Sequence, residues 1–183
     1  NSSREKARGV LPGVDLNDSL SHGFSLPPEQ QAIRDKCFHP SGTFVEFPIE
    51  DVETSIPARF EKIVRMYPDR LAVKMGDRAL TYAELNQAAN RIAHAVLEKR
   101  GSVAEPVVLL FDHSIDVIAA ILGTLKAGKF YVSVDVSFPA QRINQILGEC
   151  RAGLILTNNR PADLARQLAH RGCDVMNIGL LDT

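Results

Sequence analysis

The chain contains no tryptophan, only three cysteines and no apolar run long enough to cross a bilayer. A membrane-spanning helix needs about 20 consecutive apolar residues, so we expect no membrane partner. The cysteines, Cys37, Cys150 and Cys173, are far apart and lack the CxxC spacing of zinc sites or disulfide frameworks. We therefore expect each to be a small buried residue in a reducing, cytoplasmic protein.

The sequence also lacks an excess of charge of either sign. Its 21 basic and 22 acidic residues leave a formal net charge of -1, which gives no electrostatic reason to expect nucleic acid or an anionic surface as a partner. The opening residues, NSSREKARG, have early charges and no apolar core behind them, unlike a secretory signal. The missing initiator methionine suggests a processed or excised chain.

Motifs that bind phosphate or carry a nucleophile are absent from the sequence: GxGxxG, GxxxxGK[ST] and GxSxG do not occur. The nearest candidate is GTLKAGK, residues 123–129, which falls at the end of a predicted helix. The helix dipole favours cations there. We therefore interpret Lys126 and Lys129 as last-turn charges rather than phosphate ligands.

Composition and periodicity divide the chain into two parts. Residues 1–53 hold several prolines and no sustained apolar period, which predicts an extended or partly ordered lead-in arm. Within it, residues 28–38 could form a short helix and residues 42–50 could lie extended. Residues 54–183 have ordinary globular composition and are long enough for one α/β domain.

In this second part, local signals predict the elements one after another. Ser55 can cap a helix that ends at Pro68, and Gly76 can supply the turn of a hairpin. Thr81 and Glu84 have capping-box spacing, so a helix should begin there and end near Gly101. Short apolar runs then alternate with helical patterns; the runs are residues 106–111, 130–134 and 153–157, with a further strand at 173–177. This alternation predicts a mostly parallel sheet with helices on both faces, and we expect the strands at 106–111 and 130–134 to be buried.

One turn combines residues with chemical potential. Asp112, His113 and Ser114 follow a predicted strand, and open parallel sheets bind ligands beyond the carboxyl ends of their strands. His113 beside Asp112 could act in acid–base chemistry, but a solvated turn with Ser114 as helix cap explains the same residues and is the interpretation we favour. Asp135 also ends a strand, yet the sequence supplies no further Mg²⁺ ligands near it. We assign no catalytic, cofactor-binding or metal-binding residues.

Three motifs carry a resemblance to a known family. LTYAEL (80–85), LKAGKFYVSVD (125–135) and FPAQRI (138–143) resemble the opening motifs of adenylate-forming, or AMP-binding, enzymes, in particular nonribosomal peptide synthetase adenylation domains. The likeness extends over residues 60–158. The family prefers proline where this chain has Ser133 and Val136, so the local turn can differ.

The resemblance implies the N-terminal subdomain of an adenylate-forming fold, truncated at Thr183 before the phosphate loop. It implies an ATP- and Mg²⁺-dependent ligase of secondary metabolite biosynthesis that forms an acyl-AMP and loads a phosphopantetheine thiol on a carrier protein. We expect this fragment to bind no cofactor, to be inactive alone, and to associate with itself or with the remainder of the adenylation domain. Two alternatives stay open: a non-catalytic α/β interaction module, and the N-terminal part of an acyl-CoA ligase.

Overall fold

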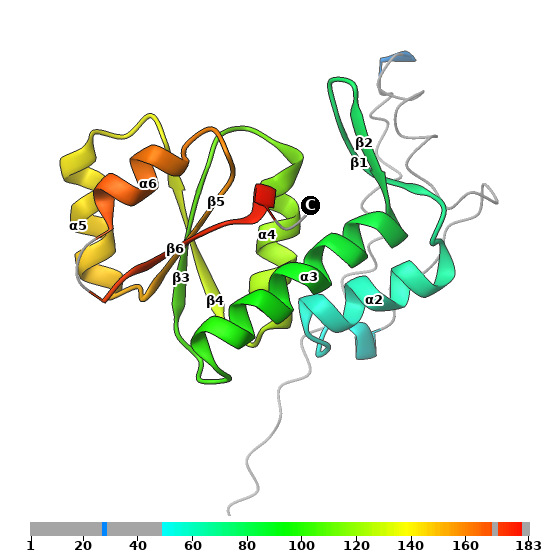
Figure 1. Ribbon diagram of the computed structural model, residues 1–183. Coiled ribbons are helices and arrows are strands. Elements are labelled where there is room, and N and C mark those ends of the chain that lie inside the picture. Colours follow the sequence, from blue (N-terminus) through cyan, green and yellow to red (C-terminus); the bar gives the residue numbers. More distant parts are fainter. Residues whose placement is uncertain (1–26, 29–48, 170–171, 181–183) are drawn as a thin grey trace, which may run out of the picture. The chain divides into compact units, whose positions relative to one another are not determined.

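The computed structural model describes residues 27–28, 49–169 and 172–180. The chain divides into two units, Asn1–Pro48 and Ile49–Thr183, and the second unit holds all the elements described below. The predictions for residues 29–48, including most of the short helix and the extended segment, lie outside the described residues. The elements are η2 (Ile49–Asp51), α2 (Ile56–Met66), β1 (Leu71–Met75), β2 (Arg78–Thr81), α3 (Tyr82–Arg100), β3 (Pro106–Phe111), α4 (Ile115–Lys126), β4 (Phe130–Asp135), α5 (Ala140–Cys150), β5 (Leu154–Thr157), α6 (Ala162–Leu168), β6 (Asp174–Asn177) and η3 (Ile178–Leu180) (Figure 1).

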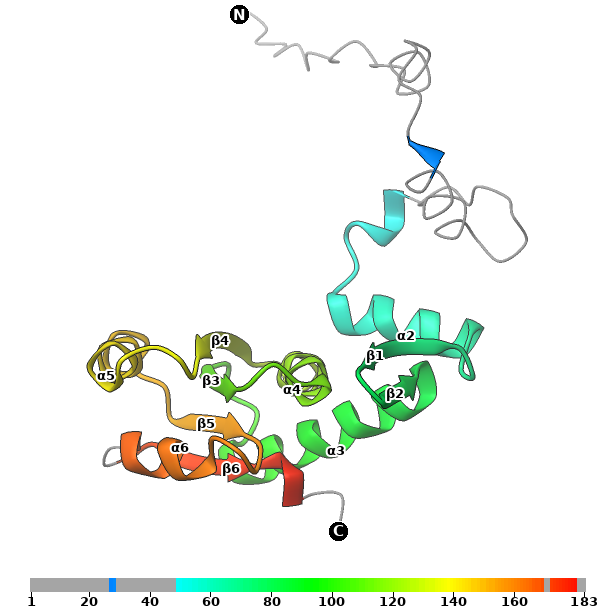
Figure 2. The same cartoon turned by 90° about the horizontal axis from the view of Figure 1, so that it is seen from above.

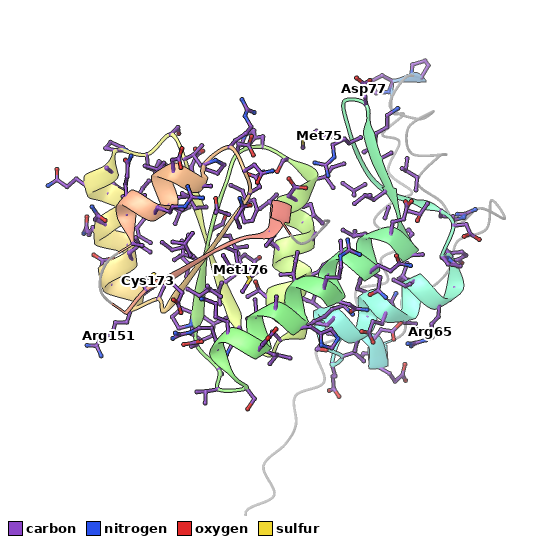
Figure 3. The ribbon with its side chains drawn as sticks, in the orientation of Figure 1. Arg65, Met75, Asp77, Arg151, Cys173 and Met176 are labelled. Carbon is purple, nitrogen blue, oxygen red and sulfur yellow. The ribbon has the colours of Figure 1, made fainter. Side chains whose placement is uncertain are left out.

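The predicted helix starts are confirmed by their hydrogen bonds. The Ala58 N–H donates to the Ser55 hydroxyl at the start of α2 (3.3 Å). At α3 the Thr81 N–H donates to Glu84 Oε2 (2.8 Å), and the Glu84 N–H donates to Thr81 Oγ1 (3.2 Å). These local bonds satisfy backbone groups that a helix end otherwise leaves open. The hairpin is also confirmed: β1 and β2 pair antiparallel, and Gly76 between them has a φ of 57°. Met75 and Asp77 mark its tip in Figure 3.

The remaining strands form the parallel sheet that the alternating pattern predicted. Their order is β4-β3-β5-β6, and every pair is parallel. Leu109 of β3 lies opposite Ser133 of β4 on one side and Leu156 of β5 on the other. Figure 2 shows α3 and α4 on one side of this sheet and α5 and α6 on the other. The α/β architecture with helices on both faces is therefore confirmed.

Each face of the sheet has its own apolar core, because side chains alternate along the strands. Val107, Leu109 and Phe111 of β3 point toward the core that α3 and α4 complete. Val108 and Leu110 point the other way, toward the core that α5 and α6 complete. The central strand is thus covered on both faces, as its unbroken apolar run predicted.

Strand β4 differs from the prediction. It was expected to be buried, but it lies at the end of the strand order, and only Val134 among its six residues is buried. Phe130 is 52% exposed and Tyr131 is 40% exposed. An apolar run predicts a strand, but the strand's position in the sheet depends on pairing partners far away in the sequence.

Lys129 also differs from its interpretation as a last-turn charge. Its side chain is fully buried, and its ammonium donates hydrogen bonds to the carbonyls of Gly101 (2.8 Å) and Val103 (2.6 Å). Glu105 lies 3.3 Å from it and also pairs with Arg100. The pKa of Glu105 is lowered by the hydrogen bonds from Arg100 and then from Lys129. Lys126 does lie in the last turn of α4, but its side chain is largely buried and pairs with Glu61 of α2.

Helices α3 and α4 approach closely at Gly123. A Cβ atom at this position would lie 2.7 Å from the Cβ of Ile92 and 2.9 Å from the carbonyl oxygen of Ala89. We expect Gly123→Ala to lower the free energy of unfolding by about 1–3 kcal/mol, because a packed core accepts added atoms poorly. Urea denaturation followed by circular dichroism would measure the change.

Gly148 on α5 provides the matched control. An added Cβ there meets no atom within 4 Å, so Gly148→Ala is expected to raise the free energy of unfolding by about 0.5–1 kcal/mol through helix propensity. If Gly123→Ala were as stable as the wild-type chain, the α3–α4 contact would be looser than described.

In the described residues, none of the helices combines the length and the apolarity that a bilayer crossing requires.

Candidate functional site

The sheet has a topological switch point between β3 and β5. These strands are neighbours, but the chain leaves β3 into α4 on one face and leaves β5 into α6 on the other face. Open parallel sheets bind ligands in the crevice that such divergent exits create at the carboxyl edge. A pocket of about 430 Å³ lies there. It is lined by Met75, Arg78, Asp112, His113, Ser114, Ile115, Asp116, Asn158, Asn159, Arg160 and Gly179.

Asn158, the first residue after β5, is at the centre of the crevice's hydrogen bonds. It is 7% exposed. Its Nδ2 group donates to Asp112 Oδ1 (3.0 Å) and Asp116 Oδ2 (3.0 Å), and it lies 3.3 Å from Ser114 Oγ. One side chain thus connects the end of β5 to the β3–α4 turn and to the first turn of α4.

Each of the two carboxylates that contact Asn158 also pairs with an arginine through its second oxygen. Arg160 Nη1 lies 2.8 Å from Asp112 Oδ2, and Arg78 Nη1 of β2 lies 3.1 Å from Asp116 Oδ1. The pKa of Asp112 is lowered, first by the hydrogen bond from Asn158 and then by Arg160. Asp112 is therefore an anion at neutral pH and is unsuited to act as a general acid.

A second set of contacts joins the exits of β5 and β6. Asn177 Nδ2 donates to Asn159 Oδ1 (2.7 Å), and the Gly179 N–H donates to Asn177 Oδ1 (3.0 Å). Gly179 lies so close to Asn159 that a Cβ atom would be 2.9 Å from its amide nitrogen. The three strand exits at this edge are thus held together by asparagine side chains.

The structure places the residues of the Asp112–His113–Ser114 turn in this crevice but gives them architectural contacts. Asp112 is held by Asn158 and Arg160, and His113 is exposed. Ser114 occupies the N-cap position of α4, but its hydroxyl makes no capping bond and lies instead beside Asn158. The prediction that Ser114 caps this helix is therefore right in position and wrong in mechanism.

Sequence reasoning missed Asn158 and Arg78. Both residues contact partners that are distant in the sequence. Asn158 contacts residues more than 40 positions earlier in the chain, and Arg78 of β2 pairs with Asp116 of α4. The available signal was a polar residue directly after a buried strand.

The described residues contain no cluster of three or more His, Cys, Asp or Glu side chains that could by itself hold a metal ion. Asp112 and Asp116 have their carboxylates occupied by Asn158 and the arginines, and Asp135 accepts from the Ser137 N–H (2.7 Å), which lowers its pKa. These three carboxylates therefore make the contacts of structural residues.

A larger hollow of about 630 Å³ lies between α2, α3 and α4. Its charged residues are already paired within the protein: Lys126 with Glu61, and Lys129 with backbone carbonyls. The carboxyl-edge crevice is the better candidate because its position follows from the sheet topology.

Comparison with known proteins connects this fold to a family. Residues 60–181 match the family model described as AMP-binding enzyme. The chain belongs to this family. The match covers the hairpin, the sheet and all the helices from α3 to α6. It therefore includes all the residues that line the crevice at the carboxyl edge.

The relatives in this family are large synthases. The chain is 36% identical over 118 residues to tyrocidine synthase 1 of Brevibacillus parabrevis, an alignment that covers 64% of this chain and 11% of that protein. It is 37% identical over 142 residues to N-(5-amino-5-carboxypentanoyl)-L-cysteinyl-D-valine synthase of Amycolatopsis lactamdurans, covering 76% of this chain and 4% of that protein. The chain therefore spans a small fraction of the length of the curated relatives it matches.

Solved structures agree with this placement. The nonribosomal peptide synthetase FmoA3, bound to alpha-methyl-L-serine-AMP, aligns with a TM-score of 0.65 and 29% identity, over 68% of this chain and 14% of that chain. The N-terminal subdomain of Klebsiella oxytoca NpsA aligns with a TM-score of 0.61 at 20% identity, over 69% of this chain and 31% of that chain. The second likeness shows the fold alone. The fold predicted from the motifs, an N-terminal part of an adenylation domain, is confirmed.

Proposed function

We propose that this chain is the N-terminal part of an enzyme that activates an amino acid as its adenylate and loads it on a carrier protein. In the first step, a carboxylate oxygen attacks the α-phosphorus of ATP and pyrophosphate leaves. In the second, a phosphopantetheine thiol attacks the acyl carbon and AMP leaves. The observation that supports this proposal best is the AMP-binding match over residues 60–181, together with the synthase relatives. Because the reaction consumes ATP, a cytoplasmic location is part of the proposal.

The contribution of this chain to the reaction is the scaffold at one side of the site. Adenylyl transfer depends on donors and a metal positioned around the phosphates, and the described residues supply no metal site. We propose that other parts of the parent enzyme provide Mg²⁺ and the phosphate contacts. The carboxyl edge of this sheet supports them, since Asn158, Asn159 and Asn177 fix its geometry.

Amino-acid-dependent exchange of pyrophosphate into ATP tests the proposal. We expect the full-length protein to catalyse the exchange with one or a few amino acids, and this chain alone to catalyse none. Mixtures of amino acids and aryl acids, followed by single acids, would identify the substrate. A carrier protein and coenzyme A should then be offered as alternative thiol acceptors.

The outcomes separate the alternatives. Acylation of coenzyme A in preference to a carrier protein would identify an acyl-CoA ligase. A full-length protein that exchanges no pyrophosphate with any acid would indicate a non-catalytic interaction module. Turnover by the isolated chain would contradict the assignment of the phosphate contacts to other parts of the enzyme.

A further inference from the structure

Asn158 makes more long-range polar contacts than its size suggests. Its amide has two hydrogens and lies within 3.3 Å of three oxygen atoms, which belong to Asp112, Ser114 and Asp116. Its Oδ1 atom is buried and, within the described part of the chain, receives no hydrogen bond. The orientation of the amide is nevertheless fixed, because the reversed amide would place Oδ1 against two carboxylates.

The surrounding charges explain why an amide is needed here. The charged groups around Asn158 are arranged in a row. The neutral amide is at the centre and donates to a carboxylate on each side, Asp112 and Asp116. Each carboxylate then pairs with an arginine at the outer end of the row, Asp112 with Arg160 and Asp116 with Arg78. An aspartate at the centre would add a third negative charge and remove both donors. A leucine would leave two partly buried carboxylate oxygens without their inner partner, which is costly.

The neighbouring residue extends this arrangement to β6. Asn159 accepts from Asn177, and Asn177 in turn accepts from the Gly179 N–H. The direction in which the chain leaves β6 is therefore tied, through residues 158 and 159, to the exits of β3 and β5. Hydrogen bonds are directional, so a network of this kind favours one geometry of the strand exits, whereas an apolar cluster tolerates several.

We propose that Asn158 is a positioning residue for adenylation: it holds the three strand exits at the carboxyl edge in the arrangement that the complete enzyme requires to bind ATP. This inference depends on the proposed function, and it assigns Asn158 no contact with substrate. A misplacement of about 1 Å can cost up to 10²-fold in rate, and we expect the loss from a displaced carboxyl edge to appear mainly in the use of ATP. Substitution of Asn158 should therefore weaken the binding of ATP more than it lowers the stability of the fold.

The test compares substitutions in the full-length protein by pyrophosphate exchange and thermal unfolding. Asn158→Asp is expected to raise the KM for ATP about tenfold or more, with a smaller change in kcat. Asn144→Asp, the same change on the exposed face of α5, is the control and should leave both constants unaltered. The double variant Asp112→Asn, Asn158→Asp restores the net charge and one amide–carboxylate contact but leaves the new carboxylate beside Asp116, so it should recover part of the ATP affinity.

Asn159→Ala keeps the test decisive if Asn158→Asp fails to fold. Asn159 is exposed, so this variant should fold, and we expect it to raise the KM for ATP about two- to fivefold. A KM for ATP that stays at the wild-type value in every folded variant would overturn the inference, even if unfolding temperatures fall. A wild-type protein with no exchange activity would instead contradict the proposed function, so the two failures are distinguishable.

Discussion

Replacing Lys129 by methionine is expected to lower the free energy of unfolding of the chain by about 2–4 kcal/mol. Methionine fills nearly the same volume, so the change isolates the ammonium group. That group is fully buried and donates to the carbonyls of Gly101 and Val103 in the loop between α3 and β3. Without the ammonium group, the carbonyls of Gly101 and Val103 lose this hydrogen-bond donor. The Glu105 carboxylate then keeps only its hydrogen bonds from Arg100.

Lys99→Met is the matched control for Lys129→Met. Lys99 pairs with Asp174 at 3.4 Å, and its side chain is 39% exposed. An exposed pair of this kind contributes about 0–1 kcal/mol, so the control should unfold at nearly the wild-type urea concentration. If Lys129→Met behaved in the same way, water would replace the ammonium in the loop, and the buried contacts would carry little stability.

The accuracy of the sequence predictions depends on the range of the interactions. The capping box of Thr81 and Glu84 and the turn at Gly76 are determined by neighbours within four residues, and both were predicted correctly. The parallel sheet followed from the alternation of elements, which is also a local pattern repeated along the chain. These features need no knowledge of how distant segments meet.

The features that were missed depend on distant segments. The exposed position of β4 follows from the strand order, which the apolar pattern of residues 130–134 does not encode. The burial of Lys129 depends on the loop at 101–105, and the central position of Asn158 depends on the turn at 112–116. The amide and the carboxylates are ordinary surface residues in the sequence, and only the switch point of the sheet brings them together.

The exposed edge of the sheet leads to the prediction with the largest expected effect on activity. Strand β4 pairs with β3 on one side and, among the described strands, with none on the other. Two aromatic side chains of β4 are also partly exposed, Phe130 by 52% and Tyr131 by 40%. Unpaired strand edges and exposed aromatic side chains tend to acquire a partner. We expect that partner to be the portion of the parent enzyme that follows residue 183.

Mixing the purified chain with that downstream portion should therefore form a complex and restore pyrophosphate exchange, from none to a measurable rate. Sedimentation velocity would follow the complex, and the same experiment on the chain alone would reveal self-association as the competing outcome. Tyr131→Lys should weaken the complex because it places a charge on the edge that must be covered. Met66→Lys, at a residue of α2 that is 53% exposed, is the control. The contrary result would be a chain that sediments as a monomer, does not bind the downstream portion and shows no pyrophosphate exchange after mixing. This result would show that the β4 edge needs no partner, and it would favour an independent interaction module.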